Sequence, residues 1–540
     1  MLLTTLTLLC GLQSFAYGQQ AIMEENFSLS TSHFQLHKAP PRKEIRHKIT
    51  QHPQDNDLQS SSARASGEYI MAKFPTMGEI RGVVILAAFA DVPFSVSADS
   101  INTLLSKRFN ADDYTEQVKF REYSNIYGKY LPLDVTIPGS ARDYFKAQSF
   151  GQFAPSFDVV GPVTLDQPRV HYGANNSSGN DKNTAGMISD ACEKANTLGL
   201  VDFSNYDNDG NGIVDIVYVV YAGSDEAQTG IDEAIWAKAS SRQFTVSDSI
   251  KIGRYACSGE LVIDLPVVAG IGTFVHEFSH VLGLPDFYNT SSNCNKLTMD
   301  MWSVMDYGMY NAEGFVPCAY TSFERYSLGW LPMHTIDQPA TMSIGTTEVD
   351  STGYRIFTSD IDNMSVITAA DTASFYVIEN IHKEGWNRYA PNNGLLISEV
   401  TYNATAWKNN KVNTETSHRH LVVPANNWWK FPQNSGDKMP EYTPPLHLFG
   451  NTNHEFTTTS TPASITQFGI TMNKPLTDIY YNDETGRTTF NFCGGNVENG
   501  IEDITIQNSE FRIHYDLLGR PVAHPSKGIY IVNGKKVIFK

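Results

Sequence analysis

The stretch that decides the fold reads VHEFSHVLGLPDFYN and spans Val275–Asn289. Its two histidines, His276 and His280, stand four residues apart, so on a helix both imidazoles project from one face and can bind one ion. Glu277, beside the first histidine, is placed to act on a water molecule that the ion activates. The order His-Glu-x-x-His predicts a helix over 270–282 that carries a zinc site.

The residues after the second histidine indicate how the metal shell is completed. Gly283 comes three residues after His280, where a helix can end in the left-handed conformation that glycine allows. The chain can then turn back and bring Asp286 to the zinc as a third ligand, which leaves a fourth position for water. Glu324, in the helix-like stretch SFERYSLGW, is the alternative third ligand.

A further pattern is SVMDYG, over Ser303–Gly308. It matches the methionine-containing turn that lies beneath the zinc in metzincin proteases. Met305 takes the place of the packed methionine. Tyr307, two residues later, is placed to contact the metal or a developing oxyanion.

Together these residues predict zinc-dependent hydrolysis of peptide bonds. Zinc lowers the pKa of a bound water molecule from about 15.7 toward about 7, and Glu277 accepts the proton of that water as general base. We therefore expect an endopeptidase that acts on protein or peptide substrates. The alternative is a surface adhesin or binding protein on an inactive protease scaffold, which predicts a damaged catalytic set, whereas every residue of the motif is present.

A second candidate metal site is the stretch DNDGNGIVD, over Asp207–Asp215, which aligns with the first nine positions of a calcium loop. Gly212 falls at the sharp-turn position, and Tyr218 replaces the usual glutamate at position 12. A buried strand follows at once, so the loop is not flanked by two helices. We expect a structural calcium site here, and a turn without metal is the alternative. The oxygen donors would be Asp207, Asp209, Asn211, the Ile213 carbonyl and Asp215.

Changes in residue composition and hydrophobic pattern along the chain predict its domain organisation. An apolar start ending in small residues indicates a signal peptide, and a polar, serine-rich segment behind it is typical of a pro-segment. Strands followed by helices predict an α/β or α+β domain, and a β-rich region comes after it. The predicted parts are a signal peptide (1–18), a pro-segment (19–78), a catalytic domain (79–335), a β-rich companion region (336–495) and a C-terminal unit (496–540).

Hydrophobic periodicity predicts the main elements. Buried strands are expected at 81–91 and 213–221, and a helix at 140–150. In the β-rich region we expect strands at 375–381, 394–402 and 419–425. Asn533-Gly534, between two apolar runs, predicts a hairpin turn.

Composition limits the class of partner. With 40 Lys and Arg against 58 Asp and Glu, the net charge is −18, which argues against nucleic acid because phosphate binding needs a basic field. No later run approaches the roughly 20 apolar residues of a membrane-spanning helix. Among the cysteines, a disulfide within the set Cys257, Cys294 and Cys318 is about as plausible as buried free thiols.

At these motifs the sequence resembles the immune inhibitor A-like (thuringilysin-like) family of secreted bacterial metalloproteases. The resemblance includes HEFSHVLGLPD, SARDYFKAQSFGQF, FDVVGPVTL, SNYDNDGNGIVDIVYVVYAG, WSVMDYG and RYSLGWL, and it continues with YVIENIHKEGW and GLLISEVTY. It implies an α+β zincin (metzincin-like) catalytic domain, broad endopeptidase activity and latency imposed by the pro-segment. Residue by residue it assigns zinc to His276 and His280 and catalysis to Glu277, with Asp286 at the position of the family's aspartate.

The tail resembles the C-terminal sorting domains of proteins exported by the type IX system of Bacteroidetes. The resemblance rests on YDLLGR (515–520) and GIYIVNGKKVIFK (528–540). It implies a small β sorting domain that engages the export machinery, and a protein that is secreted or held at the outer cell surface. A small β-unit docked on the preceding domain is the alternative.

Overall fold

The computed structural model describes residues 76–106, 135–177, 179–208, 210–247, 250–261, 268–291, 296–358, 373–429 and 447–495, with four strands after residue 513. The expected signal peptide and all but the last three residues of the expected pro-segment lie outside these ranges. The chain divides into two compact units, Met1–Gly494 and Gly495–Lys540.

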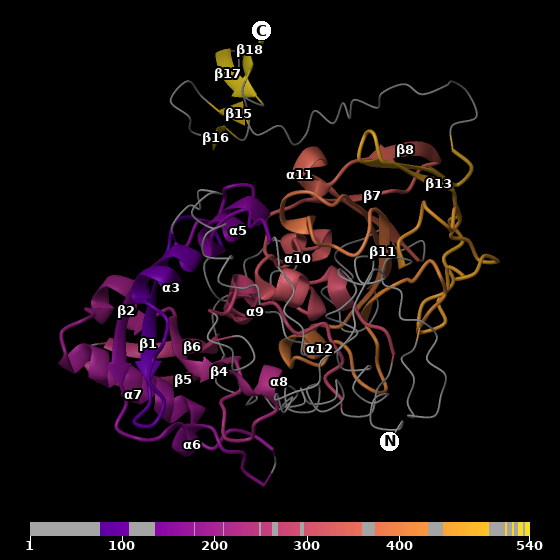
Figure 1. The fold of residues 1–540 in the computed structure, drawn as a ribbon. Coiled ribbons are helices and arrows are strands. Elements are labelled where there is room, and N and C mark those ends of the chain that lie inside the picture. The colour runs from indigo at the N-terminus through magenta and orange to yellow at the C-terminus, as the bar shows by residue number, and fades with distance from the viewer. Residues whose placement is uncertain are drawn as a thin grey trace, which may run out of the picture. The chain divides into compact units, whose positions relative to one another are not determined.

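A six-stranded sheet organises the first part of the larger unit (Figure 1). Its order is β2-β1-β4-β6-β3, all parallel, and β5 joins β6 as an antiparallel strand. β3 and β4 pair with different halves of β6, so β5 forms the other edge beside β6. The bounds are β1 Arg81–Ala88, β2 Ser156–Thr164, β3 Ile213–Val214, β4 Val217–Ser224, β5 Lys238–Ser247 and β6 Ile250–Leu261.

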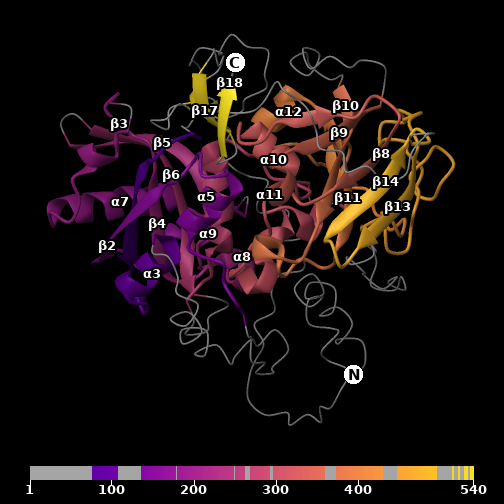
Figure 2. The same cartoon turned by 90° about the horizontal axis from the view of Figure 1, so that it is seen from above.

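Both faces of this sheet are covered. Successive side chains of a strand point to opposite sides, so alternate residues of one strand pack into different hydrophobic clusters. In β1, Val83 and Ile85 pack into one hydrophobic cluster with helix α7 (Thr184–Thr197). Val84 and Leu86 pack into another with helix α9 (Ile271–Leu282). Figure 2 shows α7 and α9 on opposite sides of the sheet. The continuous apolar run predicted for the first strand is explained by this double burial.

The prediction of one continuous strand at 213–221 is wrong in one respect. The structure breaks it at Asp215 and Ile216 into two strands, β3 and β4. The Asp215 carboxylate accepts hydrogen bonds from the backbone and the side-chain amide of Asn208, at 2.8 and 2.9 Å. This turn interaction competes with the ladder, which resumes at Val217.

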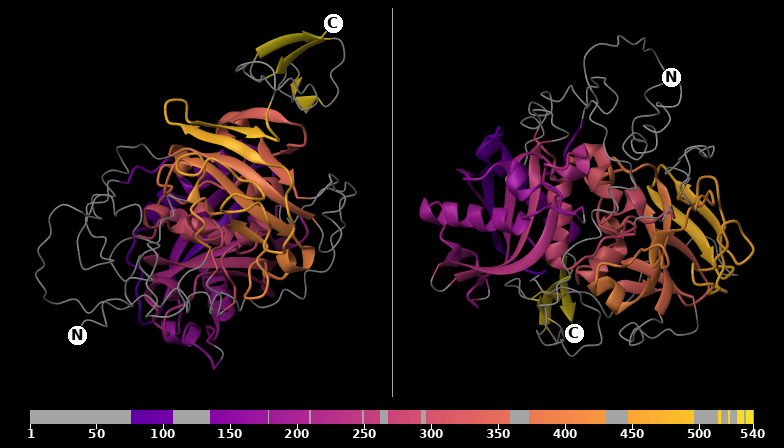
Figure 3. Two further views of the ribbon diagram at one scale, coloured as in Figure 1. Left: turned by 90° about the vertical axis from the view of Figure 1, so that its right-hand side faces the viewer. Right: turned by 90° about the horizontal axis from the view of Figure 1, so that it is seen from below.

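The β-rich region consists of two further sheets, of order β12-β11-β10-β9-β7 and β13-β14-β8. One face of the five-stranded sheet shares the hydrophobic cluster of α9, through Phe375 of β10 and Leu396 of β11. The other face packs against the three-stranded sheet, whose β13 and β14 lie on the side away from α9 (Figure 3). The bounds are β7 Met333–Thr335, β8 Ala340–Ile344, β9 Gly353–Phe357, β10 Ala373–Ile381, β11 Gly394–Tyr402, β12 His420–Val422, β13 Leu476–Asn482 and β14 Arg487–Phe492.

The strands predicted in the β-rich region are confirmed, although β12 is shorter than the predicted 419–425. Residues before and after position 335 share one core, so the β-rich region completes the fold of the larger unit.

The remaining helices are short. The helix predicted at 140–150 is α5 (Ala141–Gln148), which begins with a capping box between Ser140 and Asp143. The others are α3 Ala98–Leu105, α6 Arg169–Tyr172, α8 Glu226–Thr229, α10 Ser322–Ser327, α11 Thr347–Asp350 and α12 Ala404–Lys408, with 3-10 turns η2 Phe203–Tyr206, η3 Asp300–Trp302, η4 Tyr307–Gly314 and η6 Gly385–Asn387. In the described residues no helix is long and apolar enough to cross a membrane.

In the smaller unit, four strands pair in the order β16-β15-β17-β18. β17 (Gly528–Val532) and β18 (Lys535–Phe539) are antiparallel, with Val532 opposite Lys535, so the strands of the predicted hairpin are present. Its turn residues, 533–534, lie outside the described part. β15 is His514–Tyr515 and β16 is Pro521–Val522.

The structure bears on the choice between a disulfide and buried free thiols among Cys257, Cys294 and Cys318. Cys257 and Cys318 are buried free thiols, and burial raises the pKa of both. Cys294 lies outside the described residues.

Helix α9 approaches its neighbour so closely that glycine is required at Gly272. A Cβ atom added there would lie 1.9 Å from the carbonyl oxygen of Met309, which is backbone and cannot swing away. We predict that Gly272→Ala destabilises the protein by about 1–3 kcal/mol, because overpacking outweighs the better helix propensity of alanine. Urea unfolding measures the change. The half-buried neighbour Thr273 provides the control: Thr273→Ala should have a smaller effect, and equal stability of both variants with the parent would contradict the prediction.

Candidate metal centre

The helix that carries the motif has a glycine at each end. Gly270 caps its N-terminus in an extended conformation, and a Cβ there would lie 2.2 Å from the Gly314 carbonyl oxygen. Gly283 ends it in the left-handed conformation, with φ 108°, and its N–H donates to the carbonyls of Ser279 and His280. The predicted helix end is therefore confirmed, and the chain turns back at Leu284.

This turn brings three predicted ligands together. The Nε2 atoms of His276 and His280 lie 3.3 and 3.1 Å from Oδ1 of Asp286. Asp286 is completely buried, and the two rings are 3% and 11% exposed. Ligand atoms of His276, Glu277 and His280 also lie within 4.8 Å of one another, and this is the one His/Cys/Asp/Glu group found in the described residues that could hold a metal ion.

The second nitrogen of each ring fixes its orientation. Nδ1 of His276 lies 2.9 Å from the Val304 carbonyl oxygen, and Nδ1 of His280 lies 2.8 Å from that of Leu284. A carbonyl oxygen only accepts, so each Nδ1 carries a hydrogen, and Nε2 is the ring nitrogen left to bind an ion when the ring is neutral. Such backbone contacts are typical of metal-bound histidines.

This donor set fits zinc. Two ring nitrogens and a carboxylate oxygen converge on one buried point, an arrangement that a cation stabilises. Ligands about 2.0–2.1 Å from a tetrahedral zinc ion lie about 3.3 Å apart, close to the observed separations. Burial alone would lower the pKa of His280, but the Asp286 carboxylate raises it to about 9. The pocket therefore attracts positive charge.

Glu277 lies beside this group, 5% exposed, and its Oε2 accepts no hydrogen bond from the described residues. Burial raises the pKa of Glu277, and the two imidazoles oppose that rise. A carboxylate with an unused oxygen next to a cation site is suited to accept a proton.

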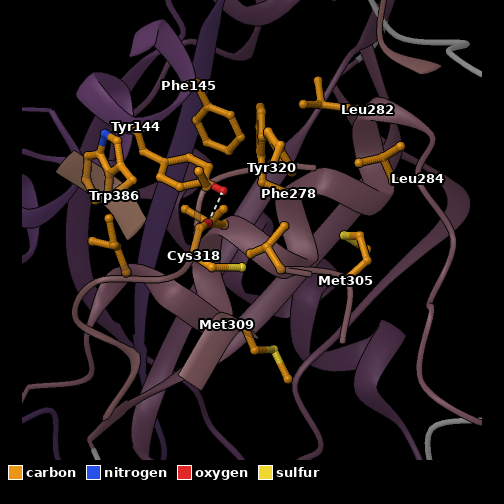
Figure 4. Close-up of a cluster of buried hydrophobic side chains, with 14 of the residues drawn as sticks. Tyr144, Phe145, Phe278, Leu282, Leu284, Met305, Met309, Cys318, Tyr320 and Trp386 are labelled. Carbon is orange, nitrogen blue, oxygen red and sulfur yellow. Dashed lines mark hydrogen bonds between the residues drawn. The ribbon is translucent and has the colours of Figure 1, made fainter. Parts of the chain in front are cut away.

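The segment Ser303–Tyr307 contacts the candidate metal centre through one backbone group. Val304 supplies the carbonyl that orients His276, and Met305 is completely buried. Figure 4 shows Met305 among the buried side chains, with Phe278 of α9 in the same cluster. A methionine turn at Met305 stays a prediction.

Tyr307 and a tyrosine that sequence reasoning missed lie close to the centre. Tyr288, Met301 and Tyr307 form a small buried cluster. The ring of Tyr288 stacks on that of His276, at 6.4 Å between centroids, and its hydroxyl has no hydrogen-bond partner in the described residues. Burial and the neighbouring Asp286 raise the pKa of Tyr288, so its hydroxyl keeps its proton. In the sequence, Tyr288 could have been found from its position two residues after the predicted ligand Asp286.

The structure does not bring Glu324 together with the histidines. One carboxylate oxygen of Glu324 accepts hydrogen bonds from the backbone and hydroxyl of Thr321, at 2.6 and 2.8 Å. The other accepts from the Ser303 hydroxyl at 2.6 Å. Glu324 therefore caps α10 and ties that helix to Ser303.

The calcium-like loop is described except for Asp209. The carboxylate of Asp207 accepts from the backbone of Asn211 and Gly212, at 3.0 and 2.7 Å. Asn211 in turn accepts from the Ile213 backbone at 2.8 Å. Calcium binding at this loop stays a prediction.

The fold and the site together define a class, a mixed α/β protein with a buried His-Glu-x-x-His centre, consistent with a zincin-like metallopeptidase. Residues 76–331 match the family model described as Immune inhibitor A peptidase M6, catalytic domain. This match supports a metallopeptidase in the region that contains the centre.

Two curated relatives agree with this assignment. Immune inhibitor A of Bacillus thuringiensis subsp. alesti is 25% identical over 270 residues, which cover 44% of this chain and 38% of the relative. The pre-pro-metalloprotease PrtV of Vibrio cholerae serotype O1 (strain M66-2) is 25% identical over 216 residues, or 35% and 23% of the two chains. The chain thus spans less than two fifths of the length of these relatives.

Proposed function

We propose that this chain is an exported zinc endopeptidase that cleaves peptide bonds of protein substrates. The observation that carries the proposal is the convergence of His276, His280 and Asp286 around a buried point, with the unused oxygen of Glu277 alongside. The intact catalytic set does not favour the alternative of an inactive scaffold that serves as an adhesin.

Zinc, when bound, acts as a Lewis acid that activates water and polarises the scissile carbonyl. Glu277 takes one proton from the attacking water and delivers it to the amine nitrogen as the C–N bond breaks, so the carboxylate is regenerated. The hydroxyls of Tyr307 and Tyr288, which pack together beside His276, would donate to the carbonyl oxygen as negative charge develops on it.

The sheet provides a place for an extended substrate. β5 is an antiparallel edge strand whose outer edge pairs with no strand in the described residues. Burial raises the pKa of Glu277, and Lys238 at the beginning of β5 is among the charged groups that oppose this rise. A peptide that adds to this edge would run past the metal centre, with backbone hydrogen bonds giving affinity.

The rest of the predicted organisation belongs to the same proposal. Export is supported by the apolar segment 1–18 and by the likeness of the tail to type IX sorting domains. Segment 19–78 would keep the enzyme latent, and the match to a protein named a pre-pro-metalloprotease agrees with this. Calcium would stabilise the loop Asp207–Asp215, a binding site that suits an extracellular module.

The test is a casein assay on the mature chain, without the first 78 residues. We predict that the protein cleaves casein, that a zinc chelator abolishes cleavage, and that added zinc restores it. Zinc content measured before and after chelation ties activity to the metal. Full activity of the metal-free protein would overturn the proposal, and so would the absence of cleavage by the zinc-loaded protein.

A further inference from the structure

The third ligand is held by a residue from the β-rich region. The side-chain oxygen of Asn410 accepts a hydrogen bond from the backbone N–H of Asp286, at 2.7 Å. The amide nitrogen of Asn410 donates to Oδ2 of Asp286 at 2.5 Å. The two residues lie 124 positions apart in the chain.

These two bonds leave the carboxylate with one defined orientation. Oδ2 is fixed by Asn410, so Oδ1 faces the Nε2 atoms of His276 and His280. Rotation about the last side-chain torsion of an aspartate is otherwise broad. An asparagine suits this task because it offers one acceptor for the N–H and one donor for the carboxylate.

The backbone around Asn410 explains why asparagine stands there. Asn410 follows α12 in the left-handed region, with φ 53°, a conformation that asparagine tolerates better than most residues. Its backbone N–H donates to the Trp407 carbonyl at 3.2 Å, which leaves the side chain for Asp286.

Further contacts tie the same two segments. Asn413 donates to the Phe287 carbonyl at 2.7 Å, and its own carbonyl accepts from the backbone of Thr290 at 2.9 Å. The ring of Phe287 packs against those of Trp407 and His420. The loop after α12 is therefore a fixed neighbour of the metal loop.

We propose that Asn410 is a positioning residue for the metal centre: it orients the Asp286 carboxylate toward the ion, so that the β-rich region supplies part of the metal site. The inference rests on the proposed zinc site. It also gives the β-rich region a role in metal binding beyond completing the core.

The test compares metal affinity in four forms of the full chain: the parent, Asn410→Gly, Asn410→Asp and the control Asn409→Asp. Glycine keeps the left-handed backbone and removes the amide, whereas aspartate keeps an acceptor and loses the donor to Oδ2. Asn409 is exposed and adjacent, so its variant repeats the charge change. We expect both Asn410 variants to bind zinc about 10–100-fold more weakly than the parent.

Two further readouts separate positioning from general stability. The absorption spectrum of the Co²⁺-loaded protein should change in the Asn410 variants and not in Asn409→Asp, and the melting temperature of the metal-free proteins should be alike. Parent-like zinc affinity in both Asn410 variants would overturn the inference, as would weaker binding matched by equal destabilisation of the metal-free form. A parent protein that binds no zinc would instead overturn the proposed function itself.

Discussion

Replacing Glu277 by glutamine is expected to lower kcat by about 10²–10⁴-fold while the zinc content stays unchanged. Glutamine has the same shape, but its amide cannot accept a proton from water. Ligand atoms of Glu277 lie within 4.8 Å of those of His276 and His280. Asp286 makes the direct contacts with both rings, and Oε2 of Glu277 accepts no hydrogen bond from the described residues.

The measurement is kcat on a fluorogenic peptide with zinc at saturation, together with the zinc content of each preparation. Glu193→Gln, an exposed change on α7, is the matched control and should be neutral. A Glu277→Gln enzyme that retains parent-like kcat would show that another group accepts the proton.

How far the sequence predicts this site depends on how local the interactions are. His276, Glu277 and His280 lie on one helix, and Gly283 and Asp286 follow within six residues, so spacing and helix-end chemistry suffice to place them. The contact between Asp286 and Asn410 crosses 124 positions, and no local pattern connects them.

Glu324 shows a local signal that was present and not used. Thr321 and Glu324 stand three residues apart at the start of a helix, which is the capping-box pattern. That pattern assigns the carboxylate to the helix end, where the structure places it. The break between β3 and β4 is a similar case, because Asp215 in an apolar run has to satisfy its carboxylate and does so through Asn208.

The division of the chain near residue 335 was harder to predict. The sequence changes there from a mixed α/β pattern to a β-rich pattern, which marks a change of secondary structure. The residues before and after position 335 nevertheless share one hydrophobic core. Hydrophobic patterning shows that a face is buried and does not show against which element. The dependence of one region on the other therefore emerges only in three dimensions.

Zinc affinity after replacement of each residue distinguishes Asp286 from Glu324 as the third ligand. We expect Asp286→Ala to weaken zinc binding by more than about 100-fold, beyond the range typical of outer-shell changes. Glu324→Gln should leave zinc affinity unchanged and destabilise the metal-free protein by about 1–3 kcal/mol, because a buried amide cannot satisfy all the donors of Thr321 and Ser303.

Zinc competition with a chelator and urea unfolding of the metal-free variants measure the two effects independently. Burial raises the pKa of Glu324 to about 7, so the comparison belongs at one fixed pH. The reverse pattern, with zinc lost in Glu324→Gln and kept in Asp286→Ala, would make Glu324 the third ligand. When the metal binds, α10 would then lose its N-terminal cap, because the Glu324 carboxylate oxygen that accepts from Thr321 cannot also bind the ion.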